Sequence, residues 1–215
     1  VDNPLNIGVF GGTFDPVHRT HLRIARAARD AAGLDLVLFV VASAPPHKRG
    51  GVMAGAEDRL AMVEAAVAGE PSFAASRAEV DRPGPSYTAD TLRQLQAEHP
   101  GAALHLILGY DSALDLPKWR EPEAILAMAR LLVFRRPECA RPLPPLLADK
   151  AVLVPFEADN LSSTEVRRRL ARGADTAGLV PPGVLEIIER KGLYHAGGTG
   201  RARQRVSGEA APGSP

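Results

Sequence analysis

Short apolar runs alternate with helical segments along most of this chain, and this alternation is the feature that most constrains its fold. Each run is mostly continuous and bounded by turn residues, which is typical of a strand buried on both faces. The runs are Leu5–Phe10, Leu36–Val41, Leu104–Leu108, Leu131–Phe134 and Val152–Val154. Helical patterns occupy Val17–Ala32, Ala56–Val67, Thr88–Glu98, Glu121–Met128, Ser163–Arg172 and Pro182–Lys191. The alternation predicts a doubly wound parallel α/β sheet that binds ligands beyond the carboxyl ends of its strands.

The composition fits one globular domain. A chain of 215 residues with 45% hydrophobic content can bury a single α/β core, which we place at residues 1–196. Residues 197–215 are rich in Gly, Arg, Ser and Pro without an apolar period, so we predict a disordered tail. A net charge of +1 gives no indication of a nucleic-acid or membrane partner. One cysteine, no apolar run of about 18 residues and no signal-peptide layout predict a cytoplasmic protein.

The segment GGTFDPVHRTH joins the first apolar run to the first helical pattern. We predict that Gly11 and Gly12 let the backbone turn sharply and approach a ligand closely. The first turn of the next helix offers unpaired N–H groups and a positive dipole end, which together bind phosphate. His18 and His21 share a helix face at that end and can donate hydrogen bonds to phosphate oxygens. A pair of metal ligands is the weaker alternative, because a positive helix end disfavours a cation.

Four other segments have both a functional and a structural interpretation. Lys48 follows two prolines after the second apolar run, where it can clamp phosphates or belong to a solvated loop. Ser86 or Thr88 can cap the helix that begins beside them. Asp111 follows the run Leu104–Leu108, where it can accept ribose hydroxyls or cap a turn. The single tryptophan, Trp119, is more typical of a core residue than of a ligand platform.

The segment LSSTEVRRR combines a helix start with three cations. Ser162 and Glu165 have the spacing of a capping box, so we expect a helix to begin here. Arginines in its first turns oppose the helix dipole by about 0.3–1 kcal/mol each when exposed, and a bound polyanion would reverse that sign. We therefore assign Arg167, the nearest to the cap, to phosphate, and interpret Arg168 and Arg169 as an ordinary solvated face.

Five motifs, in their order and spacing, resemble those of the bacterial nicotinate mononucleotide adenylyltransferases of the HxGH nucleotidyltransferase superfamily. GGTFDPVHRTH is similar to the family's GGTFDPxHxGH, APPHK to its PPHK, and SYTADTL to its SYTxxTL. GYDSALDLPKW is similar to GxDSxxxLPxW, and LSSTEVR to ISSTxIR. The resemblance extends over most of the chain, from Leu5 to Tyr194. It implies a Rossmann-like nucleotidyltransferase domain and adenylyl transfer from ATP to nicotinate mononucleotide, giving deamido-NAD and pyrophosphate in NAD biosynthesis.

The resemblance also implies how ATP is bound. His18 and His21 would be the catalytic residues and contact the ATP phosphates, with His21 nearest the reacting α-phosphate. Lys48 and Arg167 would hold the triphosphate, and Mg²⁺ would accompany ATP without a metal site made by the protein. The full set of implied ATP-binding residues is Gly11, Gly12, Thr13, Phe14, His18, His21, Lys48, Asp111, Ser163, Thr164 and Arg167.

The second substrate would lie beside the nucleotide. The resemblance implies that Asp111 contacts ribosyl groups, and that Thr88 and Trp119 hold the nicotinate, with the indole stacked on the pyridine ring. The full set of implied mononucleotide-binding residues is Asp15, Lys48, Thr88, Asp111, Trp119, Arg120 and Arg135. The attacking phosphate is already ionised, so the chemistry depends on aligning two polyanions and neutralising charge on the α-phosphate rather than on a strong base.

One position departs from the motif, because Thr20 stands where the family has glycine. We predict that its side chain points away from the phosphates. Alternative functions are transfer to the amide, nicotinamide mononucleotide, or to another acceptor such as glycerol phosphate with CTP. A nucleotide-binding regulator that has lost catalysis through Thr20 is an alternative of a different class. His18 argues against a pantetheine-phosphate adenylyltransferase, which usually has threonine there, and the oligomeric state stays open, including a homo-oligomer.

Overall fold

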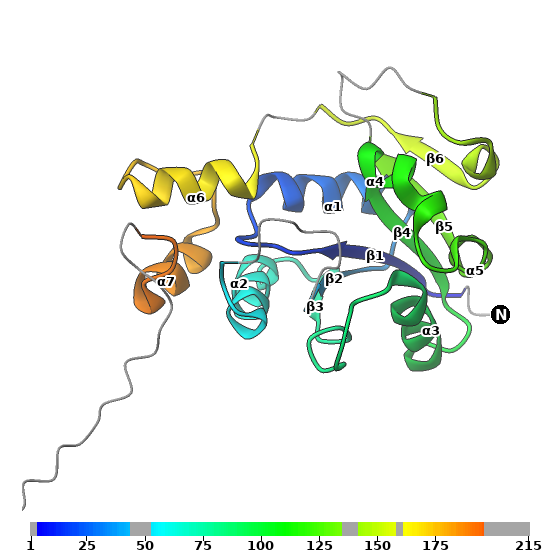
Figure 1. Cartoon of the computed structure of the whole chain (residues 1–215), viewed down its shortest axis with the longest axis horizontal. Helices are drawn as coiled ribbons and strands as arrows, with labels where there is room; N and C mark the ends of the chain where they lie inside the picture. Colours follow the sequence, from blue (N-terminus) through cyan, green and yellow to red (C-terminus); the bar gives the residue numbers. More distant parts are fainter. Residues whose placement is uncertain (1–3, 44–52, 135–141, 158–160, 196–215) are drawn as a thin grey trace, which may run out of the picture.

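The computed structural model describes residues 4–43, 53–134, 142–157 and 161–195, and these residues build one six-stranded sheet (Figure 1). Its strand order is β3-β2-β1-β4-β5-β6, and every neighbouring pair is parallel. The strands are β1 (Asn6–Gly12), β2 (Leu36–Val41), β3 (Phe73–Ser76), β4 (Ala103–Gly109), β5 (Ala129–Phe134) and β6 (Ala151–Val154). The α-helices are α1 (Arg19–Ala32), α2 (Ala56–Val67), α3 (Thr88–Glu98), α4 (Tyr110–Asp115), α5 (Pro122–Met128), α6 (Ser163–Ala171) and α7 (Pro182–Lys191). Two short 3₁₀ helices are η1 (Leu116–Lys118) and η2 (Pro145–Leu147).

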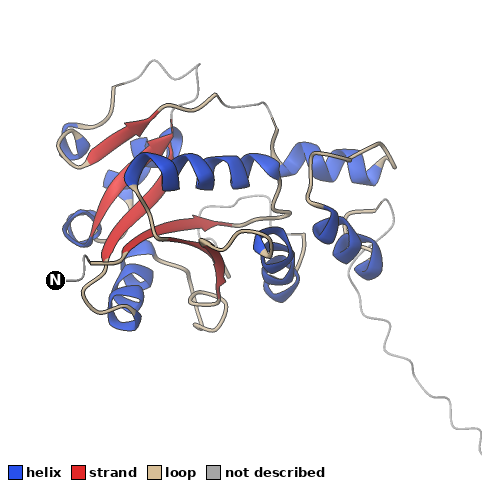
Figure 2. Cartoon of the chain, turned by 180° about the vertical axis from the view of Figure 1, so that it is seen from behind, coloured by secondary structure: helices blue, strands red, loops and turns tan. Residues whose placement is uncertain are grey.

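Helices cover both faces of the sheet, and the sheet is therefore buried on both sides (Figure 2). Successive strand residues point to opposite faces. Phe39 and Ile107 pack in one apolar cluster with side chains of α1, α2, α6 and α7. Leu38 and Leu106 pack in the other with side chains of α3, α4 and α5. This arrangement confirms the predicted Rossmann-like, doubly wound parallel α/β fold and explains why the apolar runs are continuous.

The strand order reverses direction at β1. From β1 the chain moves outward to β2 and β3, and it then returns to place β4 on the other side of β1. The carboxyl ends of β1 and β4 are therefore followed by connections that leave in opposite directions. In sheets of this kind a ligand crevice opens at such a point.

Three local features differ from the prediction. Strand β3 was not predicted, because its sequence FAAS lacks an apolar run, yet it pairs with β2 through Val37 and Phe73. Helix α1 begins at Arg19 rather than Val17, because His18 is extended at φ −145° and ψ 171°. Helix α4 and η1 were not predicted either, and they carry Asp111 and end beside Trp119.

Some predicted features lie outside the described residues. These are Lys48, Arg135 and the tail at residues 197–215. The domain boundary at residue 196 therefore stays a prediction. None of the helices in the described part of the chain is long and apolar enough to cross a membrane.

Candidate active site

The link between β1 and α1 makes its turn at Asp15 and Pro16, directly after Phe14, rather than at the two glycines. Gly11 and Gly12 belong to β1 and pair with Val40 and Val41 of β2, so the predicted glycine turn is wrong. Phe14 instead has a positive φ of 48°, which is uncommon for a residue with a side chain. Gly12 is needed for space, because a Cβ there would lie 2.8 Å from the Phe14 ring. A Cβ on Gly11 would meet nothing within 4 Å.

His18 and His21 stand together at the start of α1, as the spacing predicted. His18 is the N-cap residue, is buried, and its ring centroid lies 3.8 Å from that of His21. The His18 main-chain N–H donates to Nδ1 of His21 at 3.1 Å. This bond places the proton of a neutral His21 on Nε2, which makes that nitrogen a donor. The Phe14 ring meets the His21 ring edge-on at 5.1 Å and fixes its orientation from another side.

Asp15 has a structural position that the sequence did not indicate. Its carboxylate is 1% exposed and accepts hydrogen bonds from the Tyr194 hydroxyl at 2.7 Å and from the main-chain N–H groups of Met53 and Ala54 at 3.0 and 3.2 Å. Burial and the Asp15 carboxylate raise the pKa of the Tyr194 hydroxyl, which therefore stays a donor. The side chain of Asp15 is thus hydrogen-bonded within the fold, and its predicted place among the mononucleotide-binding residues stays a prediction.

Arg59 of α2 holds the link between β1 and α1 through hydrogen bonds to main-chain carbonyl groups. It is 1% exposed, and its Nη1 donates to the carbonyl oxygens of Thr13 at 2.8 Å and of Ala42 at 2.7 Å. Its Nε donates to the carbonyl of Ala54 at 3.1 Å. Burial lowers the pKa of this guanidinium, and the nearby Asp15 carboxylate acts in the opposite direction. Arg59 therefore ties the predicted ATP-contact residue Thr13 to the end of β2 and the start of α2.

Helix α6 brings three of the predicted ATP-binding residues to this loop. Ser163 Oγ donates to the Pro16 carbonyl at 3.0 Å, and Arg167 Nη1 donates to the Asp15 carbonyl at 2.7 Å. Arg167 Nη2 also donates to Thr164 Oγ1 at 3.3 Å. Arg167 is mostly buried, with its side chain 20% exposed. These contacts place the Arg167 guanidinium beside the link between β1 and α1, although helix α6 is about 150 positions away from that link in the sequence.

The predicted conflict between the α6 arginines and the helix dipole does not occur. Helix α6 has nine residues, so Arg168 and Arg169 lie in its last turn, where cations are favourable. Ser162 Oγ accepts from the Glu165 N–H at 3.2 Å as expected, but the Glu165 carboxylate pairs with the two arginines instead of closing a capping box. Hydrogen bonds from Arg168 and Arg169 lower the pKa of Glu165 to about 2. Both arginines form a solvated face, as predicted.

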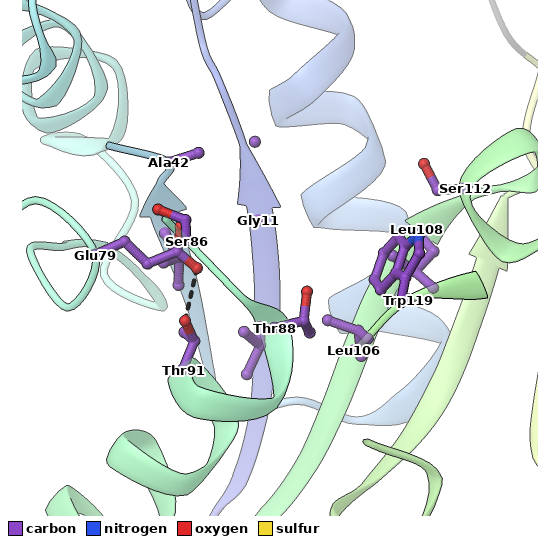
Figure 3. A pocket seen from close by; sticks show the side chains of 13 residues that line it. Gly11, Ala42, Glu79, Ser86, Thr88, Thr91, Leu106, Leu108, Ser112 and Trp119 are labelled. Carbon is purple, nitrogen blue, oxygen red and sulfur yellow. Dashed lines mark hydrogen bonds between the residues drawn. The ribbon is translucent and has the colours of Figure 1, made fainter. Parts of the chain in front are cut away.

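A cavity of about 150 Å³ opens beside the carboxyl end of β1, on the side of this strand away from α1 (Figure 3). Gly11 and Gly12 line it, and Trp119 and Thr88 face it from the end of η1 and the start of α3. Trp119 is half-buried and also packs on the apolar cluster under α3 to α5, so it has the core contact expected of a lone tryptophan, and its contact with a ligand stays a prediction. The remaining lining residues are Val9, Val40, Ala42, Glu79, Ser86, Thr91, Leu106, Leu108 and Ser112.

Neither Ser86 nor Thr88 caps α3. Its N-cap is Tyr87, which makes no side-chain capping bond. Ser86 Oγ is buried and has no hydrogen-bond partner among the described residues. Both hydroxyls line the cavity, so each is placed to meet a ligand there.

Asp111 and Arg120 lie outside the cavity lining. Asp111 is exposed in the first turn of α4, directly after the carboxyl end of β4. Arg120 is exposed, lies 4.8 Å from the Tyr87 ring centroid, and pairs with Asp90 at 3.5 Å. Thr20 is buried in the first turn of α1.

Sequence reasoning missed three residues that shape this site. Arg59 lies in an apolar helical stretch and Tyr194 just after the final helix, and both were unremarkable in the sequence. A lone arginine on the buried face of an amphipathic helix was the one available signal. Glu79 lies in the turn after β3, and nothing in its surroundings pointed to a buried carboxylate.

Comparisons with known proteins agree on one family. A family model described as Cytidylyltransferase-like matches residues 9–169. A relative from Gloeobacter violaceus named "Probable nicotinate-nucleotide adenylyltransferase" is 46% identical over 199 residues, covering 87% of this chain and 95% of the relative. One with the same name from Thermus thermophilus is 43% identical over 195 residues, covering 88% and 100%. The solved Plasmodium falciparum nicotinic acid mononucleotide adenylyltransferase complexed with NaAD is similar in fold, with a TM-score of 0.72, 18% identity and coverage of 88% and 97%.

The two glycines of β1 provide a matched pair of variants. We expect Gly12→Ala to destabilise the fold by about 1–3 kcal/mol, because its Cβ would overlap the Phe14 ring. Gly11→Ala should leave stability unchanged or slightly raised, because its Cβ meets no atom. Urea denaturation of both variants measures the difference. Equal free energies of unfolding would contradict the packing described for Phe14.

The Tyr194 hydroxyl is expected to stabilise the folded chain through Asp15. Tyr194→Phe keeps the buried ring but removes a donor to a buried carboxylate, which should cost about 1.5–3 kcal/mol. Tyr87→Phe is the control, because the Tyr87 hydroxyl makes no hydrogen bond within the described residues. Chemical denaturation of both should show a loss for Tyr194→Phe alone. Equal effects would mean that the hydroxyl contact contributes nothing.

Proposed function

The chain belongs to the cytidylyltransferase-like family, with nicotinate-nucleotide adenylyltransferases as its relatives, and from this premise we propose that it transfers the adenylyl group of ATP to nicotinate mononucleotide. The products would be deamido-NAD and pyrophosphate. One observation carries the proposal: Gly11 and Gly12 line the cavity that contains Trp119 and also lead directly into the loop that ends at the two histidines. A site for an aromatic ring and a site for phosphates therefore meet at one strand end.

The reaction joins the two substrates at the α-phosphorus of ATP. A phosphate oxygen of nicotinate mononucleotide forms the new P–O bond, and the bond to the leaving pyrophosphate breaks. The nucleophile is already an anion, so the protein's contribution is alignment and stabilisation of charge. His21 would donate from Nε2 to the α-phosphate, and His18 would hold His21 through its main-chain N–H. Arg167 would contribute a fixed cation beside the phosphates.

Mg²⁺ would enter with ATP and neutralise charge on the leaving pyrophosphate. The nearest carboxylate in the loop, Asp15, already accepts three hydrogen bonds, so it does not fit the role of a metal ligand. Within the described residues no group of three or more His, Cys, Asp or Glu side chains is arranged to hold a metal ion. The phosphates themselves would therefore be the main ligands of the metal.

The other substrate contacts follow from position. Thr88 and Trp119 would hold the nicotinate in the cavity, and Asp111, exposed after β4, would accept ribose hydroxyls. Arg120 would have to leave its contact with Tyr87 to reach a ligand. Lys48 and Arg135 are proposed on the family resemblance, and they lie outside the described residues.

We expect His21→Ala to lose most turnover while remaining folded. A donor aimed at charge that develops in the transition state contributes about 2.7–4 kcal/mol. His99→Ala, at the end of α3, is the control and should keep full activity. Pyrophosphate release from ATP and nicotinate mononucleotide measures kcat, and a thermal melt monitors folding. Near-normal activity of His21→Ala would mean that the pair only starts the helix.

The acid should be preferred over the amide. Hydroxyl donors at Ser86 and Thr88 suit a carboxylate, whereas an amide NH₂ facing them leaves buried groups unpaired at about 1–3 kcal/mol. We also expect nicotinate mononucleotide to quench the fluorescence of Trp119, the single tryptophan. Comparing kcat/KM for the two mononucleotides tests the preference. Equal values would contradict the acid assignment, and turnover with glycerol phosphate and CTP would replace the proposed reaction.

A further inference from the structure

Glu79 is a buried carboxylate in the wall of the Trp119 cavity. It lies in the turn after β3 and is 8% exposed. Its neighbours in the cavity lining include Val9, Val40 and Leu106, so much of its surroundings is apolar. A charged group is rarely placed in such surroundings unless another group compensates it. The proposed adenylyl transfer, as stated above, gives this residue no role.

The protein compensates Glu79 through a hydroxyl rather than through a direct ion pair. Within the described part of the chain, its single hydrogen bond comes from the Thr91 hydroxyl, at 2.6 Å between Oγ1 and Oε1. Arg82 donates to the same Thr91 oxygen at 2.8 Å and to Gln94 at 3.1 Å, so a guanidinium lies one hydroxyl away from the carboxylate. No ion pair to Glu79 occurs among residues 4–43, 53–134, 142–157 and 161–195. A carboxylate can accept several hydrogen bonds, so Glu79 retains the capacity to meet a further positive group.

A second group in the cavity favours the same ligand charge. Figure 3 shows Trp119 and Glu79 on opposite sides of the cavity, with Thr88 between them. The face of an indole ring attracts cations electrostatically. A planar cation between these two groups would meet a carboxylate on one side and an indole on the other. Ser86 and Thr88 add hydroxyl donors that suit a negative substituent on that ring.

We propose that Glu79 determines specificity because its carboxylate attracts the positive charge of the substrate's pyridinium ring. This inference rests on the proposed function, because it takes nicotinate mononucleotide as the occupant of the cavity. The ring nitrogen of that substrate is a fixed cation, and its carboxylate is an anion. The protein would therefore recognise both the carboxylate of the substrate and the charge of its ring. Mononucleotides with a reduced, uncharged ring bind more weakly, because they offer no positive charge to Glu79.

The test compares two ligands that differ only in ring charge. One is nicotinate mononucleotide, and the other is its carbon isostere, the 3-carboxyphenyl C-riboside 5′-phosphate, which has the same shape and no ring charge. Wild-type protein should bind the charged ligand at least about tenfold more tightly in isothermal titration calorimetry, as an opposite charge within a few ångströms implies. Glu79→Gln should lose about tenfold for the charged ligand and little or nothing for the isostere.

Glu57→Gln is the matched control, because it makes the same chemical change at an exposed residue of α2 paired with Arg77. It should leave both affinities unchanged. If Glu79→Gln weakens both ligands by the same factor, Glu79 only shapes the turn and the proposal is wrong. Equal wild-type affinities for the two ligands would overturn it as well.

Binding and turnover separate this inference from the proposed function. If the charge preference appears in calorimetry and disappears in Glu79→Gln, the inference stands even where pyrophosphate release is absent, and only the proposed reaction fails. If pyrophosphate is released but the isostere reacts as well as nicotinate mononucleotide, the reaction stands and the role of Glu79 fails. If neither ligand binds, both are overturned.

Discussion

The buried carboxylate of Asp15 is the interaction on which the phosphate side of the site depends. It accepts from Tyr194, 179 positions away, and from two main-chain N–H groups that precede α2. A buried carboxylate that lost these donors would cost several kcal/mol, so the loop has little freedom to move away. The loop that leads to the histidines is therefore tied both to the start of α2 and to the segment after α7.

Two buried charged groups beside the link between β1 and α1, Arg59 and Asp15, hold main chain in place. Arg59 satisfies carbonyl groups on both sides of the loop, and Asp15 satisfies two main-chain N–H groups just before α2. Each group has partners in fixed positions, which is the condition under which a buried charge is tolerated. His21 and Arg167, the two residues proposed to contact the phosphates, lie at the margin of this network. Their positions therefore depend on the hydrogen bonds of Arg59 and Asp15 to the main chain.

The sequence predicted α2, α3 and α7 well, because their bounds match the structure. It predicted the histidine pair because an N-cap residue and the residue three positions later adjoin at the start of a helix. It failed where the outcome depends on distant contacts. The sequence suggests a turn at Gly12, whereas the structure shows that glycine is needed there because the Phe14 ring occupies the space of a Cβ. The hydrogen bond from Tyr194 to Asp15 could not be predicted because the two residues are 179 positions apart, and Glu79 gives no local signal at all.

The two sides of the β1 end differ in their charged groups, although the chain as a whole is nearly neutral. The loop side has two imidazoles and the Arg167 guanidinium, which lies 3.7 Å from the Asp15 carboxylate, whereas the cavity side has the Glu79 carboxylate and Trp119. Nicotinate mononucleotide has an anionic phosphate at one end and, at the other, a ring that combines a cationic nitrogen with a carboxylate. A ligand bound in the reverse direction would place its phosphate beside the buried Glu79 carboxylate, and like charges at close range in an apolar cavity repel strongly. In the proposed complex this repulsion would favour the orientation with the phosphate toward the histidines, with the ring carboxylate at the hydroxyls of Ser86 and Thr88 rather than at Glu79.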